Sequence, residues 1–498
     1  MDFELAVAAD TAAAIGRLKP LSAVRDGRPR TQTVKFVCHD DLDHTLLARG
    51  LTLTESRGTW RLERLYPGTE TWLPAQPAPV VAEAASQAEV PDLPSPLAPL
   101  AAFEGKRTAS VHRFPGGNVT MSIDRGILRA VTAERPAARL LLSGAPEAVR
   151  EAALLIATSV HATIPAQPLT AQAIALATGW SPPPRHLGAP ELPDEANTLT
   201  AALAHIMGHL LDVVLWHATR LDQGPEAVHQ MRVAVRRARS AISLFRPGFA
   251  AQALTPLQAP LKILNGQLGA VRDWDVFTGE TLPAVQAALP QDERLQRLAS
   301  AAARRRQTLH KALDGWLKDP SFHLLTIHLA WCIASDSWHI LAAPEPAAEP
   351  QAEDVQPEPP PEEPCSELDG FASAMLRRRW KRLVSAGKGM DDMDLPSLHD
   401  VRLRAKRARY AAEMFATLFE GKASHRFVKR LSILQQRLGE LNDGVVATHL
   451  LTELGGPSGR HGYAAGLVAG FTAAHVVRLR PRIVSAFAKF RRQSPYWS

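Results

Sequence analysis

Residues 229–246, HQMRVAVRRARSAISLFR, decide how the second part of this chain folds. On a helix that turns by about 100° per residue, His229, Arg232, Arg236 and Arg239 form one narrow stripe. The apolar side chains of the same stretch fall on the opposite side of that helix. We therefore predict an amphipathic helix whose apolar side faces a core and whose basic stripe faces water or an anion.

The same pattern returns 170 residues later, which indicates an internal repeat. The repeated pairs are His229/His399, Arg232/Arg402, Arg236/Lys406, Arg237/Arg407, Arg239/Arg409 and Phe245/Phe415. The register continues beyond the helix, because each copy is followed 39 residues later by Leu-Gly and then by an aspartate, Asp273 or Asp443. Two copies at one spacing favour a duplicated helical unit over a chance basic helix.

The composition fits a multidomain protein with an anionic partner. The chain has 498 residues, which is too long for one ordinary core. Lys and Arg number 57 against 50 Asp and Glu, a formal net charge of +7. The basic residues gather on the repeated helices and the acidic residues in linkers, so we expect a polyanionic partner.

The three cysteines Cys38, Cys332 and Cys365 form no disulfide framework or CxxC pair, which is typical of a reducing cytosol. The first residues, MDFELAVAAD, lack the features of a signal peptide. We also find no apolar run long enough to span a membrane. A cytoplasmic protein that does not bind membranes is the expectation, while the oligomeric state stays open.

The order of the predicted elements divides the chain into two domains. Residues 1–180 read as a β-rich α+β domain, with a Pro/Ala-rich insertion at 74–100 that we take for a flexible linker or long loop. In that domain, 118–124 and 126–133 read as two strands. After a linker at 181–195, residues 196–497 read as an all-α domain. Its halves, 196–342 and 368–497, are separated by an acidic, Pro-rich insertion at 343–367 that should be disordered.

The helices of the second domain follow the apolar periodicity. We predict them at about 196–221, 226–246, 251–271, 273–289, 291–317, 321–342, 368–387, 396–420, 424–441, 443–454 and 461–492.

The first domain resembles the CYTH family, the triphosphate tunnel enzymes, over about 150 residues. The similar segments are FELAV near the N-terminus, the run from Asp41 to Leu51, SIDRG at 122–126 and LLSGAPEAV at 141–149. The resemblance implies a tunnel-shaped fold, in which carboxylates hold a divalent metal and basic side chains meet phosphate. An unrelated β-rich domain is the alternative.

The family's catalytic positions are largely replaced in this sequence. Where a CYTH enzyme has Glu-x-Glu-x-Lys, this chain has Asp2, Glu4 and Ala6, and the later Arg-x-Arg appears as Thr54 and Ser56. Metal-assisted phosphoryl transfer needs several oxygen ligands and cationic clamps. We therefore expect a degenerate CYTH-like domain that is catalytically inactive, with no catalytic residue, no metal site and no cofactor.

The helical part resembles the CHAD family over residues 196–497. The segments that carry the resemblance are VHQMRVAVRRARS (228–240), LGAVRDWDV (268–276), LHDVRLRAKRARY (398–410), LGELNDGV (438–445) and SPYW (494–497). The resemblance implies two helical bundle halves related by a pseudo-twofold axis. It also implies binding of inorganic polyphosphate and association with polyphosphate granules.

The residue types suit that ligand. Polyphosphate is a regular chain of anions, and the planar fork of arginine donates two parallel hydrogen bonds to one phosphate. The expected polyphosphate-binding residues are His229, Arg232, Arg236, Arg237, Arg239, Lys262, Arg272, Arg304, Arg305, Arg378, Arg379, Arg382, His399, Arg402, Lys406, Arg407 and Arg409. The two histidines either contact phosphate or pack the first turns of their helices.

Weaker patterns have structural explanations. His205 and His209 with Asp212 have a possible metal-ligand spacing, but no further ligand pattern supports it, and a phosphate contact or a wet helix face is favoured. Asp273 and Asp443 suggest helix capping or pairing with a nearby arginine.

Two other functions were weighed against the polyphosphate binder. A metal-dependent triphosphatase would need a cluster of Glu, Lys and Arg in the first domain. A nucleic-acid binder would need aromatic side chains among the basic ones, and only Tyr410 lies near a stripe.

Overall fold

A computed structural model describes residues 1–67, 72–183, 190–250, 253–335, 367–419 and 421–497. The chain forms two compact units. Unit 1 comprises residues 1–186, 207–216 and 316–340, and unit 2 comprises residues 187–206, 217–315 and 341–498. The expected order of a β-rich domain followed by a helical domain is confirmed.

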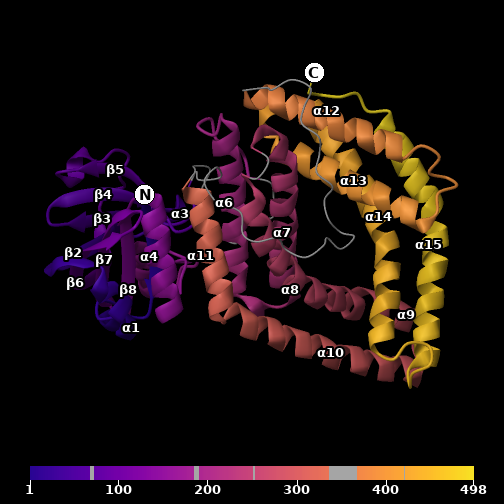
Figure 1. The fold of residues 1–498 in the computed structure, drawn as a ribbon, viewed down its shortest axis with the longest axis horizontal. Coiled ribbons are helices and arrows are strands. Elements are labelled where there is room, and N and C mark those ends of the chain that lie inside the picture. Colours follow the sequence, from indigo (N-terminus) through magenta and orange to yellow (C-terminus); the bar gives the residue numbers. More distant parts are fainter. Residues whose placement is uncertain (68–71, 184–189, 251–252, 336–366, 420, 498) are drawn as a thin grey trace. The chain divides into compact units, whose positions relative to one another are not determined.

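Unit 1 is built on one antiparallel sheet of nine strands, drawn in indigo and violet in Figure 1. The strand order is β5-β4-β3-β2-β6-β7-β8-β1-β9. The strands are β1 (Asp2–Val7), β2 (Arg25–Asp40), β3 (Leu51–Ser56), β4 (Thr59–Arg64), β5 (Val80–Ala84), β6 (Ala98–Phe114), β7 (Gly117–Ala130), β8 (Glu134–Gly144) and β9 (Ala162–Thr163). This arrangement is consistent with a CYTH-like fold.

Short helices cover this sheet. They are α1 (Ala9–Ile15), α2 (Lys19–Ala23), α3 (Thr45–Ala48), α4 (Pro146–Ser159) and α5 (Leu169–Thr178), and α11 (Pro320–Ala334) packs against α4. One sheet face is apolar, because alternate residues such as Leu140 and Leu142 of β8 are fully buried.

Two predictions for unit 1 were wrong. The strands expected at 118–124 and 126–133 form the single strand β7, since Arg125 and Gly126 keep the ladder to β6 and β8 without a break. The segment 74–100, expected as a linker or long loop, contains β5, which pairs with β4 from Trp60↔Ala84 to Glu63↔Val80. The β-branched pair Val80–Val81 supplies the strand propensity there.

Unit 2 is helical. Its main helices are α6 (Leu199–Ala218), α7 (Pro225–Phe245), α8 (Gln258–Val276), α9 (Leu282–Ala288), α10 (Glu293–Leu317), α12 (Leu368–Ala386), α13 (Leu395–Met414), α14 (Lys422–Glu453) and α15 (Gly462–Arg491). Residues 207–216 of α6 belong to unit 1. A π-helical segment, Phe277–Thr281, joins α8 to α9. Antiparallel α14 and α15 lie side by side over most of their length (Figure 1).

Apolar cores join the two halves of the repeat. Phe245 of α7, Phe371 of α12 and Phe415 of α13 pack together and are almost fully buried. In a second core, Trp274 and Phe277 belong to one cluster with Ala447, Leu450 and Val468 of α14 and α15, among others. The two halves of unit 2 therefore share their cores, as expected for one domain.

Some predicted helix boundaries were wrong. The helices expected at 424–441 and 443–454 form one helix, α14, and α8 runs without a break through residues 271–273. Asp273 thus lies inside α8 and does not cap its start, and position 443 falls within the span of α14. Apart from Glu367, the insertion 343–367 lies outside the described residues. Residues 184–189 of the linker at 181–195 also lie outside them.

One helix of the described part of the chain, α6, is long and apolar enough to cross a membrane by length and composition. This differs from the expectation that no apolar run is long enough to span a membrane. Of the apolar window in α6, 61% is buried inside the protein, and a buried core helix passes the same test.

Candidate functional site

Helix α7 presents its basic stripe as the periodicity predicted. It begins at Pro225, where proline is favourable because the first helical residue needs no backbone N–H partner. The face containing Met231, Val235 and Ile242 is buried. The stripe residues Arg232, Arg236 and Arg239 are partly exposed and line a cavity, together with His229.

This cavity lies within unit 2 and has a volume of about 510 Å³. Helices α7, α8, α13 and α14 and the π-helical segment line it. Most of the lining residues come in repeat-equivalent pairs, namely His229/His399, Arg232/Arg402, Val233/Leu403, Arg236/Lys406, Ser240/Tyr410, Val276/Val446, Phe277/Ala447 and Glu280/Leu450. The cavity is therefore lined by equivalent residues from both halves of the repeat.

Positive charge dominates the lining. Besides the paired residues, Arg239, Arg272 and Arg407 line the cavity, and its acidic lining residues are Asp273 and Glu280. Both acids come from the first half of the repeat and lie beside arginines. Arg232 Nη2 is 3.3 Å from Asp273 Oδ1, and Arg272 Nη2 is 3.6 Å from Glu280 Oε1. The first-half side of the cavity is thus partly neutralised.

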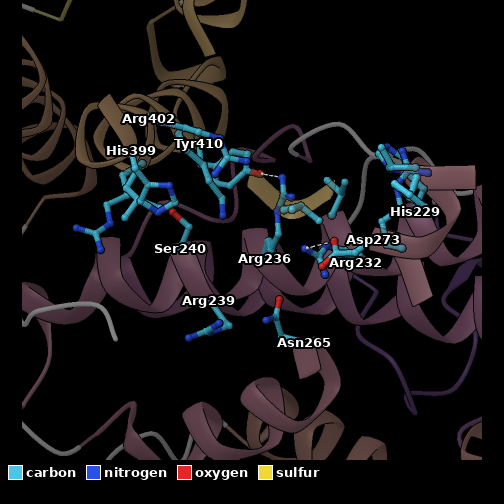
Figure 2. A pocket seen from close by; sticks show the side chains of 18 of the residues that line it. His229, Arg232, Arg236, Arg239, Ser240, Asn265, Asp273, His399, Arg402 and Tyr410 are labelled. Atoms are coloured by element: carbon cyan, nitrogen blue, oxygen red, sulfur yellow. Dashed lines mark hydrogen bonds and ion pairs between the residues drawn. The ribbon is translucent and has the colours of Figure 1, made fainter. Parts of the chain in front are cut away.

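A hydrogen bond links the two stripes. Arg236 Nη2 donates to the hydroxyl oxygen of Tyr410 at 2.9 Å. Figure 2 shows this bond and the Arg232–Asp273 ion pair among the side chains that line the cavity. Tyr410 holds the Arg236 guanidinium in place without neutralising it, which leaves its charge available to an anion.

Lys406 lies in the most strongly cationic part of this surface. Its side chain is partly buried, and burial lowers the pKa of its amine well below the ordinary value. The positive charges of Arg236, Arg402, Arg232 and Arg239 lower that pKa further. A site that disfavours one more proton so strongly favours an anion, because the anion relieves the same repulsion.

The two histidines differ in their surroundings. His229 is half-buried, and its pKa is lowered by burial and by the nearby Arg272. His399 is exposed at the start of α13, although it lines the same cavity. Both histidines line the cavity, where a bound ligand can contact their imidazole rings.

The cavity brings together nine of the predicted binding residues. They are His229, Arg232, Arg236, Arg239, Arg272, His399, Arg402, Lys406 and Arg407. The first-half and second-half stripes therefore face one shared space, although the helices that carry them are 170 residues apart in the sequence.

Three predicted residues serve the interior instead. Arg237 is buried and donates to Glu413 Oε2 at 2.7 Å, while Arg409 Nε donates to Glu413 Oε1 at 2.6 Å. Arg379 is also buried and donates to the carbonyl oxygen of Arg407 at 2.9 Å. Glu413 thus links two guanidinium groups and a backbone carbonyl holds the third, and none of these three arginines lines the cavity.

The remaining predicted residues also lie away from the lining. Lys262 and Arg304 are exposed, and Arg305 Nη2 lies 3.0 Å from Glu453 Oε2. Arg378 and Arg382 of α12 are partly exposed and have interactions of their own. Sequence reasoning missed the neutral lining residues Ser240, Asn265 and Tyr410 and the acid Glu280. The repeat register pairs Ser240 with Tyr410 and could have pointed to both.

Asp273 and His205, which belong to the weaker sequence patterns, both have partners within the protein. The expectation that Asp273 pairs with a nearby arginine is confirmed by its contact with Arg232. His205 Nε2 lies 3.0 Å from the carbonyl oxygen of Glu191, and burial lowers the pKa of its imidazole. Across the described ranges, no group of three or more His, Cys, Asp or Glu residues is placed to hold a metal ion.

Two acids of unit 1, Asp124 and Glu4, lie beside arginines. Arg107 donates to both oxygens of Asp124 at 2.7 Å, and Arg139 Nη1 lies 3.8 Å from Glu4 Oε2. Burial raises the pKa of Glu4, and the charge of Arg139 opposes that rise. Carboxylates that are already paired with arginine are poor ligands for a hard divalent cation.

An internally repeated helical domain, with a cationic cavity lined by both halves of the repeat, defines the class of this protein. Residues 198–452, half of the chain, match the family model of the CHAD domain, so the chain belongs to the CHAD family. That family is associated with polyphosphate binding.

Several known proteins are similar to this chain. The crystal structure of the CHAD domain from the plant Ricinus communis is 28% identical, with a TM-score of 0.51, over 62% of this chain and 97% of that one. Two uncharacterised proteins of Mycobacterium tuberculosis, from strains CDC 1551 and H37Rv, are each 27% identical over 285 residues, or 56% of this chain. The chain spans about half the length of these curated relatives, 50% in both cases.

Proposed function

We propose that this protein binds inorganic polyphosphate in the cationic cavity of unit 2, without hydrolysing it. The observation that carries the proposal is the convergence of two arginine-rich stripes, one from each half of the repeat, on one cavity of about 510 Å³. A linear chain of identical anions matches a site that repeats the same basic pattern across a pseudo-twofold relation.

The electrostatics of the cavity favour a polyanion over a single charge. Arg232, Arg236 and Arg402 lie close enough to Lys406 to lower the pKa of its amine, so the empty site stores like-charge repulsion. Each phosphate that binds would relieve part of this repulsion and would release counterions into the solvent. Affinity should therefore be high at low salt and fall steeply as salt is added.

The CYTH-like domain is, in this proposal, catalytically inactive. Of the acids that remain near the family's metal-binding positions, Glu4 and Asp124 are paired with Arg139 and Arg107, while Asp2 at the start of β1 is exposed. Thr54, which stands where the family has a basic residue, donates its hydroxyl to Glu63 at 3.1 Å. These contacts provide internal cross-links rather than a metal site and a phosphate clamp.

Two alternatives remain candidates for the test. A metal-dependent triphosphatase would release phosphate from polyphosphate in the presence of magnesium. A nucleic-acid binder would use the same arginines on phosphates, but bases need stacking partners, and Tyr410 of the lining is already bonded to Arg236 and is fully buried. We favour polyphosphate because it needs only the phosphate contacts.

The deciding experiment is a titration of the full chain with long-chain polyphosphate in the presence of magnesium, following binding and phosphate release together. We expect tight, salt-sensitive binding with no phosphate release, and weaker competition by single-stranded DNA of equal charge. Steady release of phosphate would instead establish the triphosphatase, and preferential binding of DNA would establish the nucleic-acid binder.

A matched pair of variants locates the site. The combined change R232A, R236A, R402A and K406A should weaken binding strongly and reduce the slope of log affinity against log salt by roughly 3, since each lost contact removes about 0.7 for a single-stranded polyanion. The control R426A, K429A, R482A and K489A removes four exposed charges away from the cavity lining. Equal losses in both variants would contradict the assignment of the cavity.

We further propose that the protein associates with polyphosphate granules in the cytoplasm. A fluorescent fusion of the full chain should form foci that stain for polyphosphate and disperse when the four cavity residues are replaced. Foci that persist in cells unable to make polyphosphate would argue against this location.

A further inference from the structure

Three repeat-equivalent pairs of stripe residues line the cavity, and only the pair Arg236 and Lys406 combines two different basic side chains. His229 matches His399 and Arg232 matches Arg402, whereas Arg236 matches Lys406. A guanidinium stays protonated at any physiological pH, while an amine can give up its proton. The repeat therefore places a potential nucleophile where its other half has a permanent charge.

Most of the charged side chains around Lys406 are cationic. Helix α7 contributes Arg232, Arg236 and Arg239, helix α13 contributes Arg402, His399 and Arg407, and helix α8 contributes Arg272 and Asp273, with His229 and Glu280 at the first-half side. Within the part of the chain that the structure describes, no side chain accepts a hydrogen bond or ion pair from Lys406. Nothing on these helices anchors its proton.

The consequence is a lysine at an anion site that gives up its proton more easily than an ordinary lysine. Burial and the neighbouring arginines lower the pKa of Lys406 well below its ordinary value. A desolvated lysine next to other cations is a recognised way to obtain a nucleophilic amine.

We propose that Lys406 is a modification site, and that its amine takes the acyl group of small acyl phosphates that bind in the cavity. The arginines would hold the phosphate end of such a molecule, and the cavity of about 510 Å³ leaves room for its carbonyl end beside the amine. The chemical class of the ligand is thus an acyl phosphate, which carries both the anion that the arginines bind and an electrophilic carbon.

The chemistry balances without a further reactant. The lone pair of the Lys406 Nζ attacks the carbonyl carbon, and a C–N bond forms as the C–O bond to the phosphate breaks. Inorganic phosphate leaves with the bonding electron pair, and the proton lost from nitrogen passes to phosphate or water. The arginines stabilise the leaving phosphate, as cationic groups do for developing negative charge.

The product would change the site. An amide nitrogen cannot take up a proton, so acylated Lys406 can no longer become positive when a polyanion binds. This regulatory effect rests on the proposed polyphosphate binding, whereas the acylation itself needs only that the cavity binds a phosphate group.

The test treats the full chain with acetyl phosphate and maps acetylated lysines by peptide mass spectrometry over time. We expect Lys406 to react at least about tenfold faster than the exposed Lys381, Lys429 and Lys489. Orientation of a bound electrophile beside an amine can accelerate a reaction by far more than this factor. Tripolyphosphate should protect Lys406 and leave the three exposed lysines unaffected. In K406R, helicity should be retained and the fast site should disappear.

The outcomes separate this inference from the proposed function. If Lys406 reacts no faster than the exposed lysines, the modification site is refuted, and polyphosphate binding measured on the untreated protein stands by itself. If Lys406 reacts fast and tripolyphosphate protects it while long-chain polyphosphate does not bind, the modification site holds and the proposed function fails. Fast reaction without protection would also overturn the inference, because it would place the reaction outside the anion site.

Discussion

Phe245 of α7 packs against Phe415 of α13, its repeat equivalent, with ring centroids 5.6 Å apart. Phe371 of α12 lies 5.7 Å from Phe245, and all three rings are at most 2% exposed. The two helices that carry the basic stripes are thus held together by their own repeated phenylalanines. The distance between the stripes, and hence the width of the cavity, depends on this contact.

The first prediction concerns that contact. Replacing Phe415 with Ala should destabilise the helical unit by about 3–5 kcal/mol, because it removes a fully buried ring and leaves a cavity. The control is F471A, since Phe471 is 38% exposed on α15 and should cost far less. Denaturant unfolding followed by circular dichroism at 222 nm measures both, and similar losses would show that the three rings are not a central core.

The second prediction uses the broken symmetry of one repeated pair. Arg239 lines the cavity, whereas its equivalent Arg409 donates to Glu413 at 2.6 Å. R239A should therefore weaken polyphosphate binding by about tenfold, because the free energy of one hydrogen bond to a charged group is lost. R409A should have a much smaller effect. Binding isotherms at one fixed salt concentration compare them. Equal losses would mean that the ligand extends beyond the cavity onto α13.

Helical periodicity was sufficient to predict much of this site. It placed His229, Arg232, Arg236 and Arg239 on one face, and the repeat placed His399, Arg402 and Lys406 on the matching face. The nine-stranded order of unit 1 was not predictable in the same way, because period-2 patterns indicate strands but not their neighbours. The unbroken β7 was missed since a Gly-containing segment, DRG, reads as a turn even where the ladder continues.

The wrong assignment of Arg237 to the binding site has a tertiary cause. Arg237 and Arg407 have the same sequence context, but Glu413 lies near Arg237 and draws it into the interior. Which of two equivalent arginines meets a ligand depends on an acid 176 positions away in the chain, and that pairing is a tertiary contact. The neutralising contacts of Asp273 and Glu280 with Arg232 and Arg272 are tertiary contacts in the same sense.

The third prediction is a pH dependence of binding. Lys406 has a lowered pKa in the empty site, and a bound polyanion favours its protonated form, so binding should take up a proton. The uptake occurs between the lowered pKa and the ordinary value of 10.5, and affinity should fall as pH rises through that window. Calorimetric titrations in buffers of different ionisation enthalpy measure the proton uptake directly.

The matching control is K406R, in which this proton uptake should vanish because arginine stays charged throughout. The same shift affects stability with the opposite sign. A lowered pKa in the folded state means that the unfolded chain binds the extra proton, so stability of the empty protein should rise with pH across the window. Proton uptake that persists in K406R would assign the effect to another group.

The fourth prediction is a gain of affinity from losing an acid. Asp273 Oδ1 lies 3.3 Å from Arg232 Nη2 and competes with any anion for that guanidinium. D273N should therefore strengthen polyphosphate binding by roughly 1 kcal/mol, about fivefold, which is the size of one charge–charge interaction near 4 Å in water. The control E453Q removes a carboxylate that pairs with Arg305 outside the cavity lining, and it should leave affinity unchanged. The gain should shrink as salt is added, because screening weakens both the competition and the attraction. A loss of affinity in D273N, with helicity intact, would show that Asp273 orients Arg232 for the ligand rather than competing with it.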